Sequence, residues 1–287
     1  MHQLHDAESF HKILGRLQQA LRRWETLGYS ARNTRVGFYE TVMQRLIDLG
    51  PEGILREFNP EEAARAYVVF SEIHEFLFVS ETICDRPHLL AHPRLREIFS
   101  GQATAANEEN PVPRNTLFEL LVASVLERAT MTTDVTKVAD VETTIGDRFL
   151  CFECKRPQGL GGLKNCMRDA TKQLRNRLPV LGETAVGIVA LSFSKVVTKG
   201  THRLEAADEG NMHAMMRRVS DVAVGHIMPF WSKYQSHSAV LVHVCVAGSI
   251  ETPFVNSQYT LAARPNITPE CLSTLQDLQE ALTKITL

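Results

Sequence analysis

The first hundred residues place apolar side chains at the spacing of amphipathic helices, with polar side chains between them. This spacing predicts four helices, over residues 6–27, 33–49, 60–82 and 93–99. Pairs that contain proline or glycine lie between these segments, and such pairs interrupt helices. The third helix has the broadest apolar stripe, which favours burial in a core over a groove that binds a partner.

A polar segment follows these helices. Residues 100–114 are poor in hydrophobic side chains and contain two prolines, Pro111 and Pro113. This composition is typical of a linker or a long loop. The sequence therefore predicts two domains, a helical accessory or regulatory domain over residues 1–105 and a second domain over residues 106–287.

The second part of the chain mixes two kinds of pattern. Continuous apolar runs rich in β-branched residues, typical of buried strands, cover residues 185–197 and 239–247. Shorter strand-like segments cover residues 138–145, 148–155 and 258–263, and helical spacing covers residues 115–129, 163–178, 211–231 and 268–282. This order predicts an α/β fold in which a mixed central β-sheet is flanked by helices.

Two of the strand-like segments form a predicted hairpin around Gly146-Asp147. Glycine supplies the positive φ that a tight two-residue turn requires. With this turn Ile145 faces Arg148, and the same register places Asp140 directly opposite Glu153. Cross-strand partners lie roughly 4.5–5.5 Å apart at Cβ, so the two carboxylates are expected to share one site.

A lysine belongs to the same face of the hairpin. Lys155 follows two residues after Glu153, and strand alternation places both side chains on one side. Glu142 also falls on this side, while Phe152 and Cys154 point the other way. An acidic face with a single lysine can hold a divalent metal ion, and the alternative is a half-exposed hairpin whose polar face is simply solvated.

The helix before the hairpin offers a further carboxylate. Thr116 and Glu119 fit a capping box at the start of the helix predicted over residues 115–129. Glu119 can instead direct its carboxylate toward Asp140 and Glu153. Both roles stay open at this point.

The helix after the hairpin is basic. Residues 153–177 contain seven basic and two acidic residues, a net charge of +5, although the whole chain has a net charge of −2. Four of the basic residues recur at helical spacing and form one stripe: Lys164, Arg168, Lys172 and Arg175. A local basic patch of this kind is what a protein needs to bind a phosphate backbone, and an ordinary solvated helix face is the alternative.

These elements, in this order, resemble the PD-(D/E)XK nuclease superfamily over roughly residues 114–200. The matching positions are a glutamate on a helix, an aspartate on a strand, an acid-x-lysine on the next strand and a glutamine on the following helix: Glu119, Asp140, Glu153, Lys155 and Gln173. Ala139 stands where the superfamily's namesake proline would be. The resemblance implies a restriction-endonuclease-like core, dependence on Mg²⁺ and cleavage of nucleic acid.

The expected mechanism assigns a role to each matching residue. Asp140 and Glu153 hold Mg²⁺, with Glu119 directly or through water, because Mg²⁺ prefers hard oxygen ligands; Mn²⁺ could substitute for it. Lys155 positions the attacking water or steadies the developing charge. Gln173 hydrogen-bonds the lysine, the water or a phosphate.

The nucleic acid is expected to be DNA rather than RNA, bound by the basic residues that follow the hairpin: Arg156, Lys164, Arg168, Lys172 and Arg175. The accessory domain favours a role in restriction or antiviral (anti-phage) defence, and a regulatory protein partner or a homodimer is compatible with it. The alternative function is a catalytically inactive nuclease-fold module that binds nucleic acid or assembles with partners.

Composition excludes several other classes. The chain has 287 residues, 44% of them hydrophobic, which is ample for a globular core, and it has no apolar run long enough for a transmembrane helix. Six scattered cysteines and an N-terminus without the apolar core of a signal peptide predict a cytoplasmic protein. Cys151 and Cys154 fall on opposite faces of a strand, and the eleven histidines show no ligand spacing on a helix, so the sequence predicts no zinc site.

Overall fold

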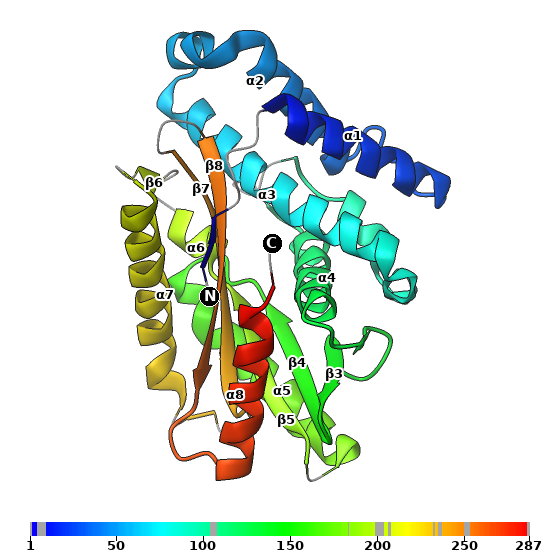
Figure 1. Ribbon diagram of the computed structural model, residues 1–287, viewed down its shortest axis with the longest axis vertical. Helices are drawn as coiled ribbons and strands as arrows, with labels where there is room; N and C mark the ends of the chain where they lie inside the picture. Colours follow the sequence, from blue (N-terminus) through cyan, green and yellow to red (C-terminus); the bar gives the residue numbers. More distant parts are fainter. Residues whose placement is uncertain are drawn as a thin grey trace.

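The computed structural model describes residues 2–4, 10–103, 108–182, 184–198, 204–205, 208–231, 233–234, 237–249 and 253–285. An eight-stranded mixed β-sheet has helices on both of its faces (Figure 1). The N-terminal helices belong to the layer on one of these faces. The predicted α/β class, with a mixed sheet, flanking helices and a helical N-terminal region, is confirmed.

The N-terminal helices follow the apolar spacing of the sequence. They are α1 (Phe10–Thr26), α2 (Arg35–Glu57) and α3 (Pro60–Asp85). The predicted end of the second helix near residue 49 is instead a kink at Gly50, whose φ of 61° is non-helical, and the helix resumes beyond it. Residues 6–9 of the first predicted helix lie outside the described residues.

The start of α3 is encoded locally. The Asn59 side chain accepts hydrogen bonds from the backbone N–H groups of Glu61 and Glu62, and Glu62 accepts one from the Asn59 backbone. This capping box satisfies N–H groups that a helix start leaves without partners. The fourth predicted helix, over residues 93–99, is the short 3-10 helix η2 (Leu95–Phe99), and another short 3-10 helix, η1 (Pro87–Ala91), precedes it.

The strands lie side by side in the order β1 (His2–Leu4), β8 (Pro253–Ala263), β7 (Ala239–Ser249), β5 (Val186–Ser192), β4 (Arg148–Lys155), β3 (Val141–Ile145) and β2 (Thr133–Asp134), and β6 (Leu204–Glu205) pairs with β7. The neighbours β4, β5 and β7 pair in parallel, whereas β2–β3, β3–β4, β7–β8 and β8–β1 are antiparallel. All of β5 is buried, as its continuous apolar run predicts. The predicted edge strand 258–263 is half of β8, which lies between β7 and β1.

Helices cover both faces of this sheet (Figure 1). On one face lie α3, α4 (Val112–Arg128) and α8 (Pro269–Thr283), and on the other lie α5 (Leu160–Leu181) and α7 (Glu209–Trp231). A short helix, α6 (Ser194–Thr198), follows β5. The helix predicted over residues 163–178 continues to Leu181, because Pro179 is accommodated inside the last turn of α5.

The N-terminal helices and the sheet share one hydrophobic core. A single cluster of buried side chains runs from Leu17 on α1 through Phe76 on α3 and Leu120 on α4 to Phe152 on β4 and Leu241 on β7. The predicted boundary at residue 105 therefore does not separate two hydrophobic cores. The boundary itself falls within residues 104–107, which lie outside the described residues.

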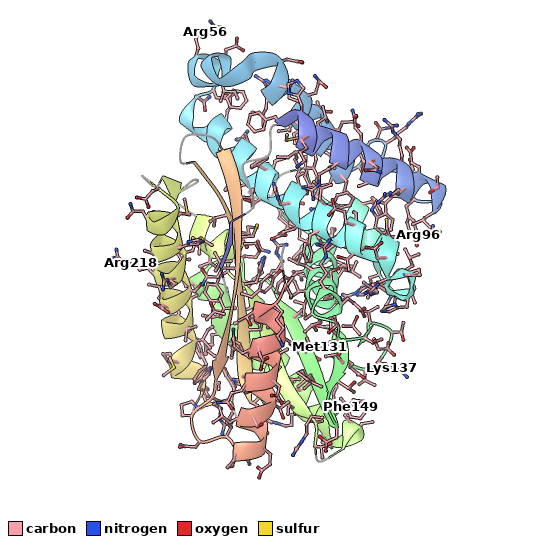
Figure 2. All side chains as sticks on the ribbon, viewed as in Figure 1. Arg56, Arg96, Met131, Lys137, Phe149 and Arg218 are labelled. Carbon is pink, nitrogen blue, oxygen red and sulfur yellow. The ribbon has the colours of Figure 1, made fainter. Side chains whose placement is uncertain are left out.

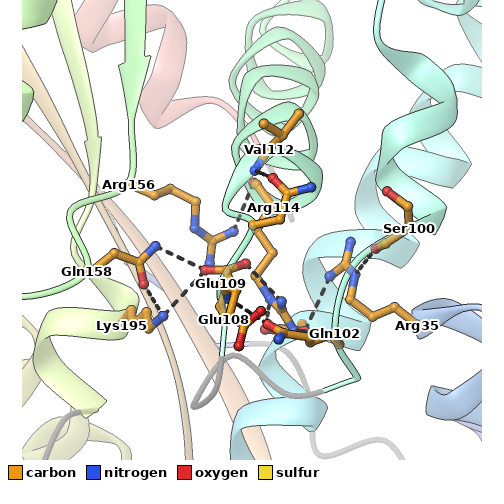
Figure 3. A network of polar contacts seen from close by, with 12 residues as sticks. Arg35, Ser100, Gln102, Glu108, Glu109, Val112, Arg114, Arg156, Gln158 and Lys195 are labelled. Atoms are coloured by element: carbon orange, nitrogen blue, oxygen red, sulfur yellow. Dashed lines mark hydrogen bonds and ion pairs between the residues drawn. The ribbon is translucent and has the colours of Figure 1, made fainter.

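Polar contacts fix the described parts of the predicted linker (Figure 3). The buried Glu108 carboxylate lies 2.9 Å from Arg114 Nη1, 3.0 Å from Gln158 Nε2 and 3.4 Å from Lys195 Nζ. The backbone N–H of Glu109 donates to Gln102 Oε1 at 2.7 Å. The segment is therefore tied to α4, to the end of β4 and to α6.

Charged side chains cover the outer surfaces of the helices. Arg56 on α2, Arg96 on η2 and Arg218 on α7 all point away from the body of the molecule (Figure 2). Within the described ranges, no helix has the length and apolar character that crossing a membrane requires.

Candidate active site

The hairpin has the register that its turn predicts. Ile145 pairs with Arg148, and the ladder continues to Val141 opposite Phe152. Gly146 adopts a φ of 58° in the turn. Asp140 directly precedes β3, so the register extends it to a position opposite Glu153.

Three predicted residues come together at this end of the hairpin. Asp140 Oδ2 accepts a hydrogen bond from the backbone N–H of Cys154 at 2.9 Å, which fixes the carboxylate against β4. Lys155 Nζ lies 3.3 Å from Asp140 Oδ2 and 3.5 Å from Glu153 Oε2. The predicted grouping of Asp140, Glu153 and Lys155 is present in the structure.

The site is only partly open to solvent. The Glu153 side chain is fully buried, whereas Asp140 and Lys155 are 12% and 20% exposed. Glu153 faces α5, because alternation along β4 places it on the same side as Cys151, which packs in the core beneath that helix. A simply solvated hairpin face is therefore excluded for Glu153.

Arg177 on α5 completes the site, and the sequence analysis did not single it out. Its guanidinium contacts Glu153 Oε1 directly and lies 3.8 Å from Asp140 Oδ1. Two carboxylates thus face two cations, Lys155 and Arg177. The sequence could have indicated this residue, because Arg177 follows Gln173 by one helical turn and both side chains therefore leave α5 on the same side.

Burial controls the protonation of the site. Burial of Glu153, with the neighbouring Asp140 charge adding to the effect, raises the pKa of its carboxyl to about 8, although Lys155 and Arg177 oppose the rise. Burial lowers the pKa of Lys155, but the carboxylates of Asp140 and Glu153 outweigh it, so the net pKa is raised. Lys155 is therefore a cation at neutral pH.

Gln173 lies on α5 one turn before Arg177. Its Oε1 atom is buried and accepts no hydrogen bond from the residues that the structure describes. Leaving a buried acceptor unpaired costs about 1–3 kcal/mol, so this oxygen is ready for a donor such as water.

Glu119 is not brought to this site. Its buried carboxylate accepts hydrogen bonds from Arg94 at 2.6 and 2.7 Å and lies 3.0 Å from His92 Nε2. The alternative capping role is wrong, since α4 begins at Val112 and its N-cap Pro111 makes no side-chain capping bond. Glu119 instead joins α4 to the segment before it.

The predicted basic residues divide into two groups. Arg156 turns inward, with its side chain 7% exposed, and its Nη1 lies 3.2 Å from Glu75 Oε2 and 3.3 Å from the Arg114 carbonyl. This residue is part of a buried ion pair and does not join a surface patch. The predicted stripe on α5 is exposed throughout, at Lys164, Arg168, Lys172 and Arg175.

A large groove lies elsewhere. It has a volume of about 640 Å³ and is lined by α1, α2 and the turn between them, including Gln18, Arg22, Asn33 and Glu40. The residues that line it include none from the hairpin or from α5. The carboxylates of the hairpin and this groove are therefore separate features of the molecule.

Asp140 and Glu153 are the residues that could hold a magnesium ion. Both offer hard oxygen atoms, and Glu153 Oε2 is buried without a hydrogen-bond donor among the described residues. The donor set fits Mg²⁺ as a two-carboxylate site, because Glu119 is engaged elsewhere. Arg177 would have to release the carboxylates when the ion binds.

Comparison of the chain with protein-family models, with curated proteins and with solved structures finds no match. The functional argument therefore rests on the geometry of Asp140, Glu153, Lys155 and Arg177.

Proposed function

We propose that the protein is a metal-dependent nuclease that hydrolyses phosphodiester bonds, with DNA as the preferred substrate. The observation that carries the proposal is the acid–acid–lysine cluster, in which Lys155 Nζ lies within 3.5 Å of both Asp140 and Glu153. The same arrangement is the hallmark of the PD-(D/E)XK resemblance. The strands and helices around it, α4–β2–β3–β4–α5–β5, are compatible with a restriction-endonuclease-like core.

Each side chain has a role in the proposed hydrolysis. Asp140 and Glu153 would hold Mg²⁺, and the bound ion would supply positive charge that lowers the pKa of water and stabilises charge on the phosphate. Lys155 stays protonated and stabilises the charge that develops on the phosphate oxygens. Gln173 would accept a hydrogen bond from the attacking water, whose oxygen forms the new P–O bond as the bond to the leaving oxygen breaks. The proton that the water loses passes to solvent, and the leaving oxygen takes a proton from solvent.

The exposed stripe on α5 supports a nucleic-acid substrate. Four cations on one helix face lie on the element that also carries Gln173 and Arg177. Contacts between such cations and backbone phosphates position a duplex without reading its sequence. The stripe would therefore guide the strand toward the carboxylates.

The second candidate is a nuclease-fold module that binds nucleic acid without cleaving it. The observation that favours it is Arg177, which contacts both carboxylates and, together with Lys155, balances their charge without a metal ion. In such a module the cluster would be a permanent salt-bridge network.

Titration with Mn²⁺ separates the two candidates. The nuclease proposal expects one binding site that Asp140→Asn weakens strongly, while Glu142→Gln, a matched change on the same face of the hairpin, leaves it intact. Absence of any binding that depends on Asp140 would favour the non-catalytic module. Metal-dependent cleavage that persists in both Asp140→Ala and Lys155→Ala would refute the proposal.

A further inference from the structure

A second polar cluster is buried between α3 and β7. Glu75, His243 and Cys245 each present one potential metal-ligating atom, and these atoms lie within 4.8 Å of one another. The three residues are 3%, 0% and 1% exposed. This cluster is separate from the carboxylates of the hairpin and takes no part in the proposed hydrolysis.

The fold brings the three residues together. His243 and Cys245 are two positions apart on β7, so both side chains leave the same face of the strand. Glu75 reaches this face from α3, which packs against β7 in the shared core. The imidazole of His243 lies between the rings of Phe118 and Tyr259, at centroid distances of 5.7 and 4.7 Å, which holds its orientation.

Two polar atoms of the cluster lack hydrogen-bond partners among the described residues, whereas the Cys245 thiol donates to the Ser71 carbonyl at 3.9 Å. Glu75 Oε2 lies 3.2 Å from Arg156 Nη1, and His243 Nε2 lies 3.0 Å from Ser257 Oγ. The other atoms, Glu75 Oε1 and His243 Nδ1, are buried and form no hydrogen bond with the described residues. Each such atom costs about 1–3 kcal/mol, so an occupant that satisfied both would be stabilised at this position.

A cavity of about 20 Å³ lies beside the cluster. Glu75 and Cys245 line it together with Ser257 and Tyr259, and His243 lies next to it without lining it. A volume of this size admits one water-sized occupant. The space therefore suits a single ion and excludes a larger ligand.

Burial governs the protonation of the three donors, and it raises the pKa of the Glu75 carboxyl although Arg156 opposes the rise. Burial, together with the charge of Arg156, lowers the pKa of His243 to about 3, so the imidazole is neutral and can donate a lone pair. Burial raises the pKa of the Cys245 thiol well above its usual value. The thiol therefore keeps its proton unless a bound cation displaces it.

We infer that Glu75, His243 and Cys245 form a structural site for a divalent transition metal, with Zn²⁺ as the best fit. Nitrogen, sulfur and one carboxylate oxygen are the ligands that zinc takes in tetrahedral sites. Bond lengths of about 2.0–2.3 Å place such ligands roughly 3.3–3.8 Å apart, so binding draws these atoms inward by about 1 Å. The Cys245 proton leaves to solvent, and a water in the cavity provides the fourth ligand.

The proposed ion would tie the N-terminal helices to the sheet. One ligand comes from α3 and two come from β7, so the metal bridges elements that lie far apart in the sequence. Binding to the folded chain alone stabilises it by mass action.

Substitution of the full-length protein with Co²⁺ tests the site. Cobalt bound to a thiolate gives a charge-transfer absorption band, which is expected in the wild type and in Cys151→Ser, a matched buried cysteine on the neighbouring core. The band is expected to disappear in Cys245→Ser. Zinc analysis of the same proteins should give about one equivalent in the first two and much less in the third.

Glu75→Gln provides a second variant if Cys245→Ser fails to fold. It keeps the shape of the side chain, and it is expected to weaken Zn²⁺ at least about tenfold, which corresponds to ~1.4 kcal/mol. Wild-type protein that shows no cobalt–thiolate band would overturn the inference. So would stoichiometric zinc that is retained by both Cys245→Ser and Glu75→Gln.

Discussion

At the scale of single residues, charge balance explains the candidate site. Asp140 and Glu153 are held close by the hairpin, and their repulsion is relieved by Lys155, by Arg177 and by the proton that Glu153 keeps below about pH 8. A divalent cation would also offset this repulsion, so we expect Arg177 and the metal ion to compete for the carboxylates.

Replacement of Arg177 tests this competition. Arg177→Gln removes a guanidinium that contacts Glu153, so the carboxylates should bind Mn²⁺ more tightly, by about tenfold or ~1.4 kcal/mol. Isothermal titration of the wild type and the variant measures the difference. Arg175→Gln, an exposed neighbour on α5, is the matched control and should leave the affinity unchanged. Weaker Mn²⁺ binding by Arg177→Gln would show that the arginine supports the metal ion instead.

The raised pKa of Glu153 predicts how stability depends on pH. The folded carboxyl holds its proton up to about pH 8, whereas the unfolded carboxyl loses it near its ordinary pKa of 4.5. The favourable contribution is therefore complete below pH 4.5 and is lost as the pH rises to about 8. Relative to Glu153→Gln, the metal-free wild type should lose on the order of 1–3 kcal/mol of unfolding free energy across this window.

Chemical denaturation at a series of pH values, with chelator present, measures this effect. Glu142→Gln is the control, because it removes a carboxylate from the same hairpin without touching the cluster. A free-energy difference between wild type and Glu153→Gln that stays constant from pH 4.5 to 8 would contradict the assignment.

At the scale of elements, α5 links the site to the predicted substrate. Its buried side packs on the sheet through Leu163, Met167 and Leu174, and Arg177 reaches Glu153. The exposed side carries the basic stripe. One helix thus carries both Arg177, which contacts Glu153, and the basic stripe that we propose binds phosphate.

Removal of the stripe should change the salt dependence of DNA binding. Glutamine at Lys164, Lys172, Arg168 and Arg175 removes four cations, and each phosphate contact contributes about 0.9 to the slope of log K against log salt. The slope should become shallower by up to roughly 3–4 units, measured by fluorescence anisotropy with duplex DNA. The double change Arg22→Gln with Arg23→Gln, on the exposed side of α1, should leave the slope unchanged. An equal change of the slope in the α5 variant and in the α1 double variant would show that the stripe is only a solvated helix face.

The patterns in the sequence predicted the helices and strands better than the side-chain contacts between them. The turn at Gly146 was sufficient to give the hairpin register, because strand pairing is fixed by turn length. The role of Glu119 could not be predicted in this way, since its partners His92 and Arg94 come from a preceding irregular segment. For the same reason the pairing of Glu75 with His243 and Cys245 could not be predicted. The expectation of no zinc site followed from the opposite faces of Cys151 and Cys154 on one strand and from the absence of histidine spacing on a helix.

At the scale of the whole molecule, the N-terminal helices are part of the main body. The buried faces of α3 and α4 pack together and onto the sheet within one core. Glu72 on α3 adds a buried ion pair with Arg114 on α4, at 2.6 Å. The two-domain organisation stays a prediction, and the shared core leads us to expect that residues 1–105 and 106–287 fold together.

Deletion of residues 1–105 should therefore abolish cooperative folding. The deletion exposes the apolar faces of α4 and β7 and leaves Arg114 without Glu72, and loss of one partner of a buried ion pair alone costs about 3–5 kcal/mol. Circular dichroism during thermal unfolding should show no sharp transition. A soluble, cooperatively folding fragment 106–287 that still binds Mn²⁺ would establish the two-domain organisation instead.

The central claim is that Asp140, Glu153 and Lys155 form a nuclease site. The most direct measurement is cleavage of plasmid, linear and single-stranded DNA, and of RNA, with Mg²⁺ or Mn²⁺, by the wild type and by Lys155→Ala. We predict metal-dependent cleavage by the wild type, strongest on DNA, and its loss in a Lys155→Ala protein that keeps the wild-type unfolding transition. Cleavage by Lys155→Ala at the wild-type rate would contradict the account.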